Sequence, residues 1–304
     1  MDKRRMKGQF GFGESLKTMK PVTRDLSVIV GCYNESANLE TNIIELAQFL
    51  DGLKRSYELL VVDDGSLDNS VAILRDLEQK VPGLVVLRNP KNMGKGFSIR
   101  NGILNCSGKY IIFTDSDMAY AQTNVRTVLE RLESGCPVVV GNRRLPDSVY
   151  TVNNRLVRYV YRRHFLGTAF NLVIRRLFGI TTHDTQSGLK GFQRQVAERI
   201  FERIYTDGFL FDVEVFVRAK RLGIPIEEIP VHLTYSSDAS TVRQLRSFFT
   251  ILPELMRIKM LDLRGAYDSP PLPQADHADG TPASHEQRSL EPNAAAGSKP
   301  PANP

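Results

Sequence analysis

Several features of familiar protein classes are missing from this sequence of 304 residues. Its three cysteines, Cys32, Cys106 and Cys136, are too few and too isolated for a disulfide framework, which favours reduced thiols in the cytoplasm. No stretch approaches the roughly 18–20 uninterrupted apolar residues of a membrane-spanning helix. The N-terminus is basic but lacks the apolar core of a signal peptide. We therefore expect a soluble protein, or one that lies on the surface of a membrane.

Basic charge is in excess, but the motifs that usually direct it to nucleic acid are absent. The net charge is +6 and the isoelectric point is about 9.2. The sequence contains neither zinc-finger spacing nor an aromatic–basic RNA motif, and it has no internal repeats. The charge therefore favours phosphorylated substrates or an anionic membrane surface over nucleic acid. The composition leaves the oligomeric state open.

Short apolar strands alternate with helical patterns along the first half of the chain. The expected strands cover residues 26–34, 57–66, 84–90, 110–117 and 137–144, and helical patterns cover residues 36–47, 71–77, 94–105 and 122–133. Repeats of strand and helix with nearly continuous apolar strands predict an α/β fold, with a mostly parallel sheet covered on both faces. Ligands of such sheets bind at the carboxyl ends of the strands, where this sequence places its polar residues.

The pattern predicts one α/β domain over residues 25–240, preceded by a flexible segment at 1–24. Residues 155–178 mix arginine with large apolar residues, and residues 241–264 do the same. The second of these segments is expected to form an amphipathic helix at a membrane interface, with a core helix that has a solvated basic face as the alternative. Residues 265–304 have almost no large apolar side chains, which predicts a disordered tail.

Two carboxylates follow the apolar strand in the segment GKYIIFTDSDMAY. In an extended chain Asp115 and Asp117 would point to the same side, where their charges repel unless a cation lies near them. Paired carboxylates suit a hard cation such as Mg²⁺ or Mn²⁺, which completes its shell with water and substrate phosphates. The implied ligand is a diphosphate. A solvated turn is the alternative for such a pair taken alone.

Other strand ends add acidic and basic groups. Asp63 and Asp64 end the second strand and can accept hydrogen bonds from a ribose or a base, although a helix-capping turn would also use them. Positive charge comes from Lys95, Arg100 and the pair Arg143–Arg144, for which a surface loop is the alternative when the GKG motif is taken alone. Together these groups predict a site for a nucleotide diphosphate and a metal.

The motifs VGCYNE, VVDDGS, NMGKGFSIRNG, FTDSD and VVVGNRR resemble, in order and spacing, those of inverting family-2 glycosyltransferases of the GT-A nucleotide-diphospho-sugar transferase fold. The motif DTQSGLKGF is similar to that of polyprenyl-phosphate hexosyltransferases, and more to the dolichyl-phosphate glucosyltransferases than to the mannose synthases. The resemblance covers roughly residues 25–245.

That resemblance implies a metal-dependent enzyme that uses Mg²⁺ or Mn²⁺. It would move a hexose from a nucleotide-diphosphate sugar to a polyprenyl or dolichyl phosphate. UDP-glucose is the favoured donor, and GDP-mannose or a glycan hydroxyl acceptor are the alternatives. The enzyme would work in peripheral contact with an anionic membrane, at its cytoplasmic face.

The family's motifs imply a role for each matching residue. Asp63 and Asp64 match the nucleoside-binding motif, and Asp115 and Asp117 match the aspartates near the diphosphate and the metal. Asp184 matches the acidic residue beside the acceptor; it must take a proton from a hydroxyl acceptor, but not from a phosphate. The further residues assigned to the nucleotide sugar are Tyr33, Asn34, Glu35, Lys95, Arg100 and Ser116. Those assigned to catalysis beside Asp184 are Gln186 and Arg143, and those assigned to the acceptor phosphate are Arg143, Arg144, Arg155 and Arg243.

The sequence departs from the family in two places. Gly31-Cys32 stands where a proline is usual, and Thr241 stands where a lysine is common, which leaves Arg243 as a substitute. Other classes fit less well. A dinucleotide-dependent dehydrogenase or a sugar nucleotidyltransferase would need a glycine-rich loop after the first strand, which is missing. A non-catalytic membrane adaptor would leave the polar strand ends unexplained.

Overall fold

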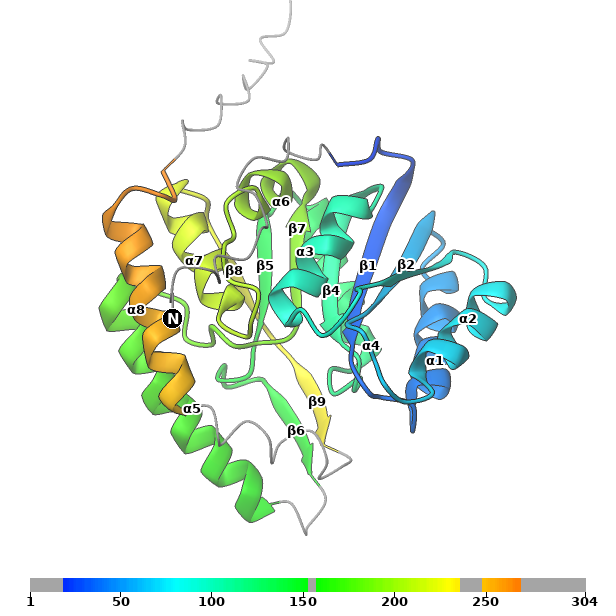
Figure 1. Ribbon diagram of the computed structural model, residues 1–304, viewed down its shortest axis with the longest axis horizontal. Coiled ribbons are helices and arrows are strands. Elements are labelled where there is room, and N and C mark those ends of the chain that lie inside the picture. The colour runs from blue at the N-terminus through cyan, green and yellow to red at the C-terminus, as the bar shows by residue number, and fades with distance from the viewer. Residues whose placement is uncertain (1–18, 153–156, 236–247, 269–304) are drawn as a thin grey trace, which may run out of the picture. The chain divides into compact units, whose positions relative to one another are not determined.

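Strands and helices alternate as the apolar pattern predicts, in a computed structural model that describes residues 19–152, 157–235 and 248–268 (Figure 1). The strands are β1 (Arg24–Cys32), β2 (Tyr57–Asp63), β3 (Leu84–Arg88), β4 (Gly108–Asp115), β5 (Val138–Asn142), β6 (Val149–Val152), β7 (Lys190–Gln193), β8 (Glu227–Pro230) and β9 (His232–Tyr235). The helices are α1 (Leu39–Asp51), α2 (Ser70–Lys80), α3 (Lys95–Asn105), α4 (Gln122–Glu133), α5 (Val157–Phe178), α6 (Arg194–Phe201), α7 (Phe211–Arg221) and α8 (Phe248–Leu263).

Seven strands form the main sheet, in the order β3-β2-β1-β4-β7-β5-β8. All neighbours are parallel except β7, which is antiparallel to both β4 and β5. Strands β6 and β9 form a separate parallel pair. The prediction of an α/β fold with a mostly parallel sheet is therefore confirmed, while no pattern in the sequence indicated the inserted antiparallel strand.

The two faces of the sheet are covered by different helices. Alternate residues of one strand point to opposite faces, so Ile29 of β1 packs with helices α3, α6 and α7, and Val28 and Val30 pack with α1, α2 and α4. Both sets of strand residues are fully buried. Burial on both faces explains why the strands are nearly continuous runs of Val, Ile and Leu.

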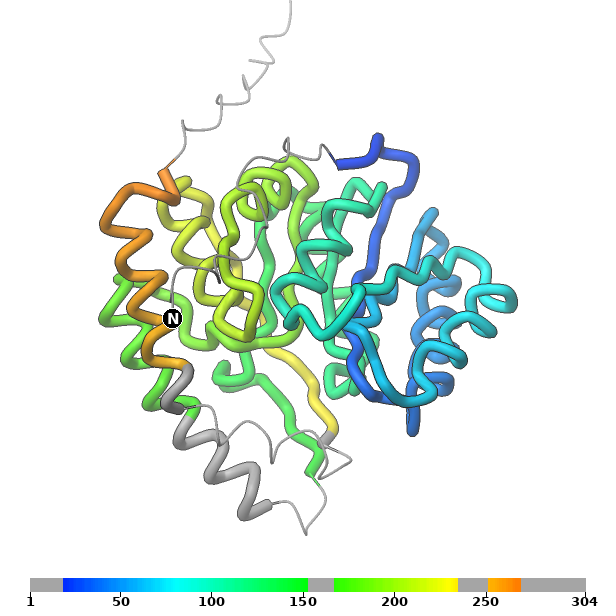
Figure 2. The backbone as a smooth tube through the Cα atoms, viewed as in Figure 1, coloured from blue at the N-terminus to red at the C-terminus, as the bar shows by residue number. Residues whose placement is uncertain are grey.

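Helices α5 and α8 run along the same side of the molecule (Figure 2). Lys259 of α8 donates a hydrogen bond to the carbonyl of Leu177 in α5, with an Nζ–O distance of 2.8 Å. Each helix buries one side, through Ile174 in α5 and Ile258 in α8. Among the described ranges, no helix combines the length and the apolar content needed to cross a membrane.

The first residues of the tail predicted at 265–304, up to Asp268, lie within the described part of the chain. Tyr267 is fully buried and its hydroxyl donates to the carboxylate of Glu214, while its carbonyl accepts from Arg218. The side chain of Tyr267 therefore anchors this segment. The composition of the whole forty-residue tail does not reveal a single buried aromatic residue. The flexible segment predicted at 1–24 and the start of the helix predicted at 241–264 lie largely outside the described residues.

Candidate active site

The carboxyl ends of three neighbouring strands bring the predicted polar residues together. In the parallel register, Cys32 of β1 pairs with Asp63 of β2, and Gly31 pairs with Asp115 of β4. The loop after β1 carries Asn34 and Glu35 past the same edge. Residues about 30 and 80 positions apart in the sequence therefore lie together at the carboxyl end of the sheet. This is the end at which ligands bind in such folds.

Asn34 ties the loop after β1 to the loop after β2. Its backbone has φ of 54°, in the left-handed region that Asn tolerates better than most residues. Its N–H donates to Ser66 Oγ over 2.9 Å, and its side-chain oxygen accepts from the N–H of Leu67 over 2.8 Å. The preceding Tyr33 is half-buried. These bonds hold the two loops in one fixed arrangement.

The two aspartates at the end of β2 are both held by hydrogen bonds, Asp63 within its own loop and Asp64 to the loop after β3. Asp63 accepts hydrogen bonds from the N–H of Ser66 and pairs with Arg88 over 3.4 Å. Asp64 accepts three hydrogen bonds of 2.8 Å, from the side chain of Asn89 and from the N–H groups of Met93 and Gly94. Asp64 thus holds the loop that leads into α3. A contact of either carboxylate with a nucleoside stays a prediction.

Asp115, at the end of β4, has a lysine as its counter-ion. Lys95, the first residue of α3, places Nζ 2.7 Å from Asp115 Oδ1. Burial alone would raise the pKa of Asp115, but the charge and hydrogen bond of Lys95 outweigh it, so the pKa lies below its ordinary value. The cation that the acidic pair required is therefore supplied by the GKG motif. Lys95 is the nearest described partner that neutralises this carboxylate.

The prediction that Asp115 and Asp117 point to the same side assumed an extended chain through both residues, but the strand ends at the first of them. Strand β4 stops at Asp115, and Ser116 and Asp117 form a turn, with Met118 at φ of 48°. Asp117 is exposed and accepts from the N–H of Ala119 over 3.1 Å. The carbonyl of Ser116 accepts from the side chain of Asn42. The rule of alternation therefore does not apply to Asp117, and the turn sets its direction.

A third carboxylate lies near this pair. Burial raises the pKa of Glu35, and the negative charges of Asp117, Asp68 and Asp115 add to the effect. No group of three or more residues with metal-ligand geometry occurs within the described residues. Asp115 and Asp117 fit Mg²⁺ or Mn²⁺ as hard oxygen donors, provided that phosphate oxygens and water complete the coordination shell.

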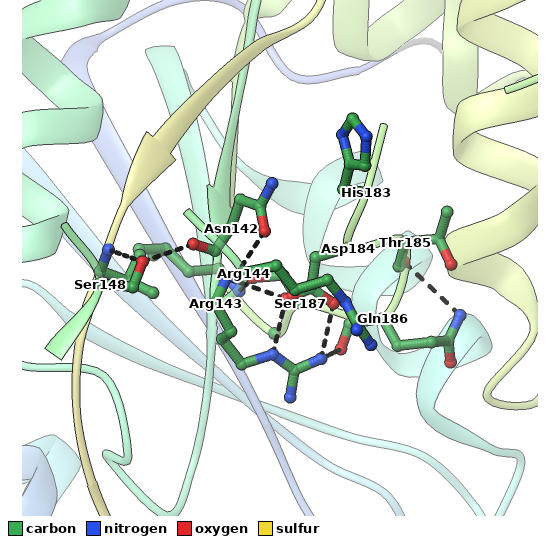
Figure 3. Close-up of polar contacts among 12 residues, drawn as sticks. Asn142, Arg143, Arg144, Ser148, His183, Asp184, Thr185, Gln186 and Ser187 are labelled. Carbon is green, nitrogen blue, oxygen red and sulfur yellow. Dashed lines mark hydrogen bonds and ion pairs between the residues drawn. The ribbon is translucent and has the colours of Figure 1, made fainter. Parts of the chain in front are cut away.

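Asp184 is held rigidly by an arginine that follows strand β5 (Figure 3). It is fully buried, and Arg143 donates to it from the backbone N–H over 3.0 Å, from Nε over 2.7 Å and from Nη2 over 2.8 Å. Burial raises the pKa of Asp184, but the charge and hydrogen bonds of Arg143 outweigh this and lower it. Nη2 also donates to the carbonyl of Gln186 over 2.9 Å. Arg143 therefore holds the DTQSG loop and is less suited to bind a phosphate as well.

The other predicted cations have different surroundings. Arg144 donates to Thr168 of α5, while its Nε, although buried, has no hydrogen-bond partner within the described residues. Arg100 donates to the carbonyl of Ile204 over 2.8 Å and pairs with Asp207 over 3.6 Å, so it contacts the loop before α7. The structure thus leaves Arg144, rather than Arg143, with unused hydrogen-bonding capacity. Arg155 and Arg243 lie outside the described residues.

Three residues to which the sequence analysis gave no role hold the DTQSG loop, and a fourth pairs with one of them. The hydroxyl of Tyr120 lies 3.0 Å from Ser187 Oγ and accepts from the N–H of Gly188, and Asn171 of α5 accepts from Thr185. Buried Lys190 donates to the carbonyl of Ser187 and to Asp212. Tyr120 and Lys190 stand in the segments GKYIIFTDSDMAY and DTQSGLKGF, but only the spatial arrangement shows what their side chains contact.

Gly188 brings this loop against the carboxylate of Asp115. A Cβ at this position would lie 1.8 Å from Asp115 Oδ2, so a larger residue would displace the carboxylate. Asp115 and the loop that carries Asp184 are consequently in direct contact. The carboxylates around Asp115 form one side of the site and the arginine-bound Asp184 forms the other, with Gly188 between them. Such a site can place two substrates next to each other.

Comparison with known proteins gives consistent matches. A family model described as glycosyl transferase family 2 matches residues 27–201. The dolichyl-phosphate beta-glucosyltransferase of Dictyostelium discoideum is 32% identical over 254 residues, which cover 80% of this chain and 76% of that protein. The enzyme of the same description from Saccharomyces cerevisiae is 29% identical over 265 residues, with the same coverage.

Solved structures match the fold. Glucosyl-3-phosphoglycerate synthase from Mycobacterium tuberculosis, in complex with UDP, superposes with a TM-score of 0.56 at 19% identity, over 78% of this chain and 80% of that chain. The same enzyme with Mn²⁺, UDP and glucosyl-3-phosphoglycerate gives a TM-score of 0.54 at 20% identity, over 81% of each chain. At such identities the likeness shows the fold alone, and it confirms the expected GT-A architecture.

Proposed function

Because the chain belongs to glycosyl transferase family 2, we propose that it transfers glucose from UDP-glucose to a dolichyl or other polyprenyl phosphate, with inversion at the anomeric carbon. The observation that carries the proposal is the similarity to dolichyl-phosphate beta-glucosyltransferases over four fifths of the chain. The neighbouring structures that contain UDP with Mn²⁺ or Mg²⁺ support a uridine nucleotide and a divalent metal.

On the donor side, Asp115 and Asp117 would hold the metal, with Glu35 nearby. A bound Mg²⁺ or Mn²⁺ would supply positive charge where negative charge builds on the departing diphosphate. Lys95 is the protein's own cation at this place, 2.7 Å from Asp115. Its ammonium can bond to a phosphate oxygen as the sugar–phosphate bond breaks, and a positive group placed where charge develops lowers the barrier.

On the acceptor side, Asp184 acts as a fixed negative group and not as a strong base. A phosphomonoester has its second pKa near 6, so at neutral pH it already carries a nucleophilic oxygen. The lowered pKa of Asp184, caused by Arg143 against the opposing effect of burial, fits a residue that orients the acceptor. Arg144, which follows Arg143 and is partly exposed, is the cation we assign to the acceptor phosphate.

The contact with the membrane involves the outer sides of α5 and α8. Large apolar side chains are exposed on both helices, at Leu172, Val173, Leu252, Met256, Met260 and Leu263. Arg176, Arg257 and Arg264 are exposed on or just beyond the same helices. Apolar side chains that enter the lipid and arginines that meet anionic headgroups favour peripheral binding. Three free cysteines fit the cytoplasmic face of that membrane.

Transfer of radiolabelled sugar tests the proposal. UDP-glucose and GDP-mannose are each offered with Mn²⁺, together with a short-chain polyprenyl phosphate or a glycan acceptor. We expect a glucosyl phospholipid from UDP-glucose and polyprenyl phosphate, and co-sedimentation with anionic liposomes that high salt reduces. Transfer from GDP-mannose would reassign the donor, and transfer to glycan hydroxyls alone would reassign the acceptor.

A further inference from the structure

A buried ion pair lies beneath the DTQSG loop. Lys190 Nζ, from β7, is 2.6 Å from Asp212 Oδ1, from the first turn of α7. The two side chains are 0% and 4% exposed, and burial lowers the pKa of Lys190 and raises that of Asp212. The same Nζ lies over the rings of Phe113 and Phe216, at 5.3 and 5.4 Å from their centroids.

A buried ion pair stabilises a protein core less than its short distance suggests. Each buried ion loses several kcal/mol of hydration, and apolar residues of similar volume often give equal or greater stability. Stability alone therefore does not account for a lysine and an aspartate at these positions.

The third contact of Lys190 connects it to the reaction site. Nζ donates to the carbonyl of Ser187 over 2.5 Å. Ser187 follows Asp184 by three residues, and the next residue, Gly188, contacts the carboxylate of Asp115. On its other side, this turn is bonded to the hydroxyl of Tyr120. The position of one turn therefore sets the separation between Asp184 and Asp115.

We propose that Lys190 and Asp212 are positioning residues, which fix the Ser187–Gly188 turn and thereby the distance between the donor and acceptor sides of the site. Asp212 directs the ammonium, and the ammonium holds the carbonyl of Ser187 from below. The pair touches neither substrate. This role rests on the proposed function, since it concerns how the two substrates of that reaction are aligned.

The double variant Lys190→Met/Asp212→Val removes both charges and nearly keeps the volume of the pair. Because apolar replacement of a buried pair is often neutral, we expect a melting temperature close to that of the wild type. We expect kcat to fall by about 10- to 100-fold with the KM for the donor nearly unchanged, since a misplacement of 1 Å can cost 10²-fold in rate. We also expect faster hydrogen exchange of the amides in residues 184–188.

The control variant is Arg55→Met/Glu133→Leu, which removes an ion pair of 3.0 Å near the amino ends of the strands. It should change neither kcat nor amide exchange in the loop. A folded Lys190→Met/Asp212→Val protein with wild-type kcat and wild-type exchange would overturn the proposal. If that variant does not fold, the isosteric variant Asp212→Asn is measured in its place. Unchanged kcat and unchanged amide exchange in that variant would also overturn the proposal.

The two proposals can fail separately. A wild-type protein that binds UDP but transfers no sugar counts against the proposed function, while the exchange measurement still reports on the turn. A wild-type protein that transfers sugar, beside a folded double variant that does so equally well, counts against the positioning role alone.

Discussion

Replacing Asp184 by Asn tests the acceptor side of the site. The substitution keeps the shape of the side chain and removes its charge, which leaves the guanidinium of Arg143 without its ionic partner. We expect transfer to fall by about 10²-fold or more, as it does when one preorganised polar group is removed from a reaction site. We also expect the fold to lose stability.

The size of that loss follows from the geometry. Removing one partner of a buried ion pair costs about 3–5 kcal/mol. Arg143 is 19% exposed, so water can hydrate it, and the amide oxygen introduced by Asp184→Asn can still accept a hydrogen bond; both lower the cost to about 2–3 kcal/mol. At about 2–4 °C per kcal/mol for a domain of this size, the melting temperature should drop by about 4–12 °C.

The pH dependence gives a second readout. The folded pKa of Asp184 lies below its unfolded value of about 3.9, so the ion pair contributes fully above that pH and is lost as the pH falls through the folded pKa. The difference in melting temperature between wild type and Asp184→Asn should therefore be constant from about pH 8 to pH 5 and shrink below about pH 4.

Thermal melts and initial rates of transfer check both expectations. The matched control is Asp76→Asn, which breaks an exposed pair with Lys80 and should change neither, since exposed pairs contribute less than about 1 kcal/mol. An Asp184→Asn protein that melts like the wild type, or keeps turnover within a few-fold of it, would refute this account of the Asp184–Arg143 pair.

Three further changes address the metal, the lysine and the C-terminal boundary. Asp117→Asn should abolish stabilisation by UDP with Mn²⁺ while the protein alone melts normally, because Asp117 is exposed; persistent metal-dependent stabilisation would contradict this. Lys95→Met should lower the rate of transfer but strengthen the binding of Mn²⁺ in the absence of nucleotide, because Asp115 loses a competing cation. Calorimetry measures that binding, and weaker binding of Mn²⁺ would contradict the role of Lys95 as counter-ion. Truncation after Arg264 should melt lower than truncation after Asp268, because only the first removes buried Tyr267, and equal melts would exclude that anchor.

The strands, the helices and the end of the sheet that carries the site are well predicted by the sequence. Continuous apolar runs such as Leu59–Val62 indicate one structure clearly. Four fully buried valine or leucine residues in a row fit a strand that is covered on both faces. Short elements are different. Strand β7 has four residues, two of them charged or amide-bearing, and is recognisable only through its pairing with Phe113 and Val140.

The site was predicted as a set of residues but not as a set of contacts. Charge type and strand ends identified Asp115 and Lys95, and a motif identified Asp184, because those properties are local. Which cation pairs with which carboxylate depends on the fold, and Arg143, one of the arginines assigned to the acceptor phosphate, donates to Asp184. Asp64 shows the same limit, since its three donors come from a loop about 25–30 residues further along the chain.

The contacts reveal a common principle in this site. Each of three carboxylates has its own cation, with Asp115 bound to Lys95, Asp184 to Arg143 and Asp212 to Lys190, at 2.6–2.7 Å. Two of these pairs also join a strand to a helix, β4 to α3 and β7 to α7. Because fixed opposite charges need no rearrangement when a substrate arrives, the protein bears the cost of orienting them during folding, before the reaction begins. A glycosyl transfer that separates positive charge on the sugar from negative charge on a diphosphate requires such prior arrangement, and this accounts for the three pairs at the site and beneath it, whereas pairs such as Arg55–Glu133 and Lys80–Asp76 lie at the surface.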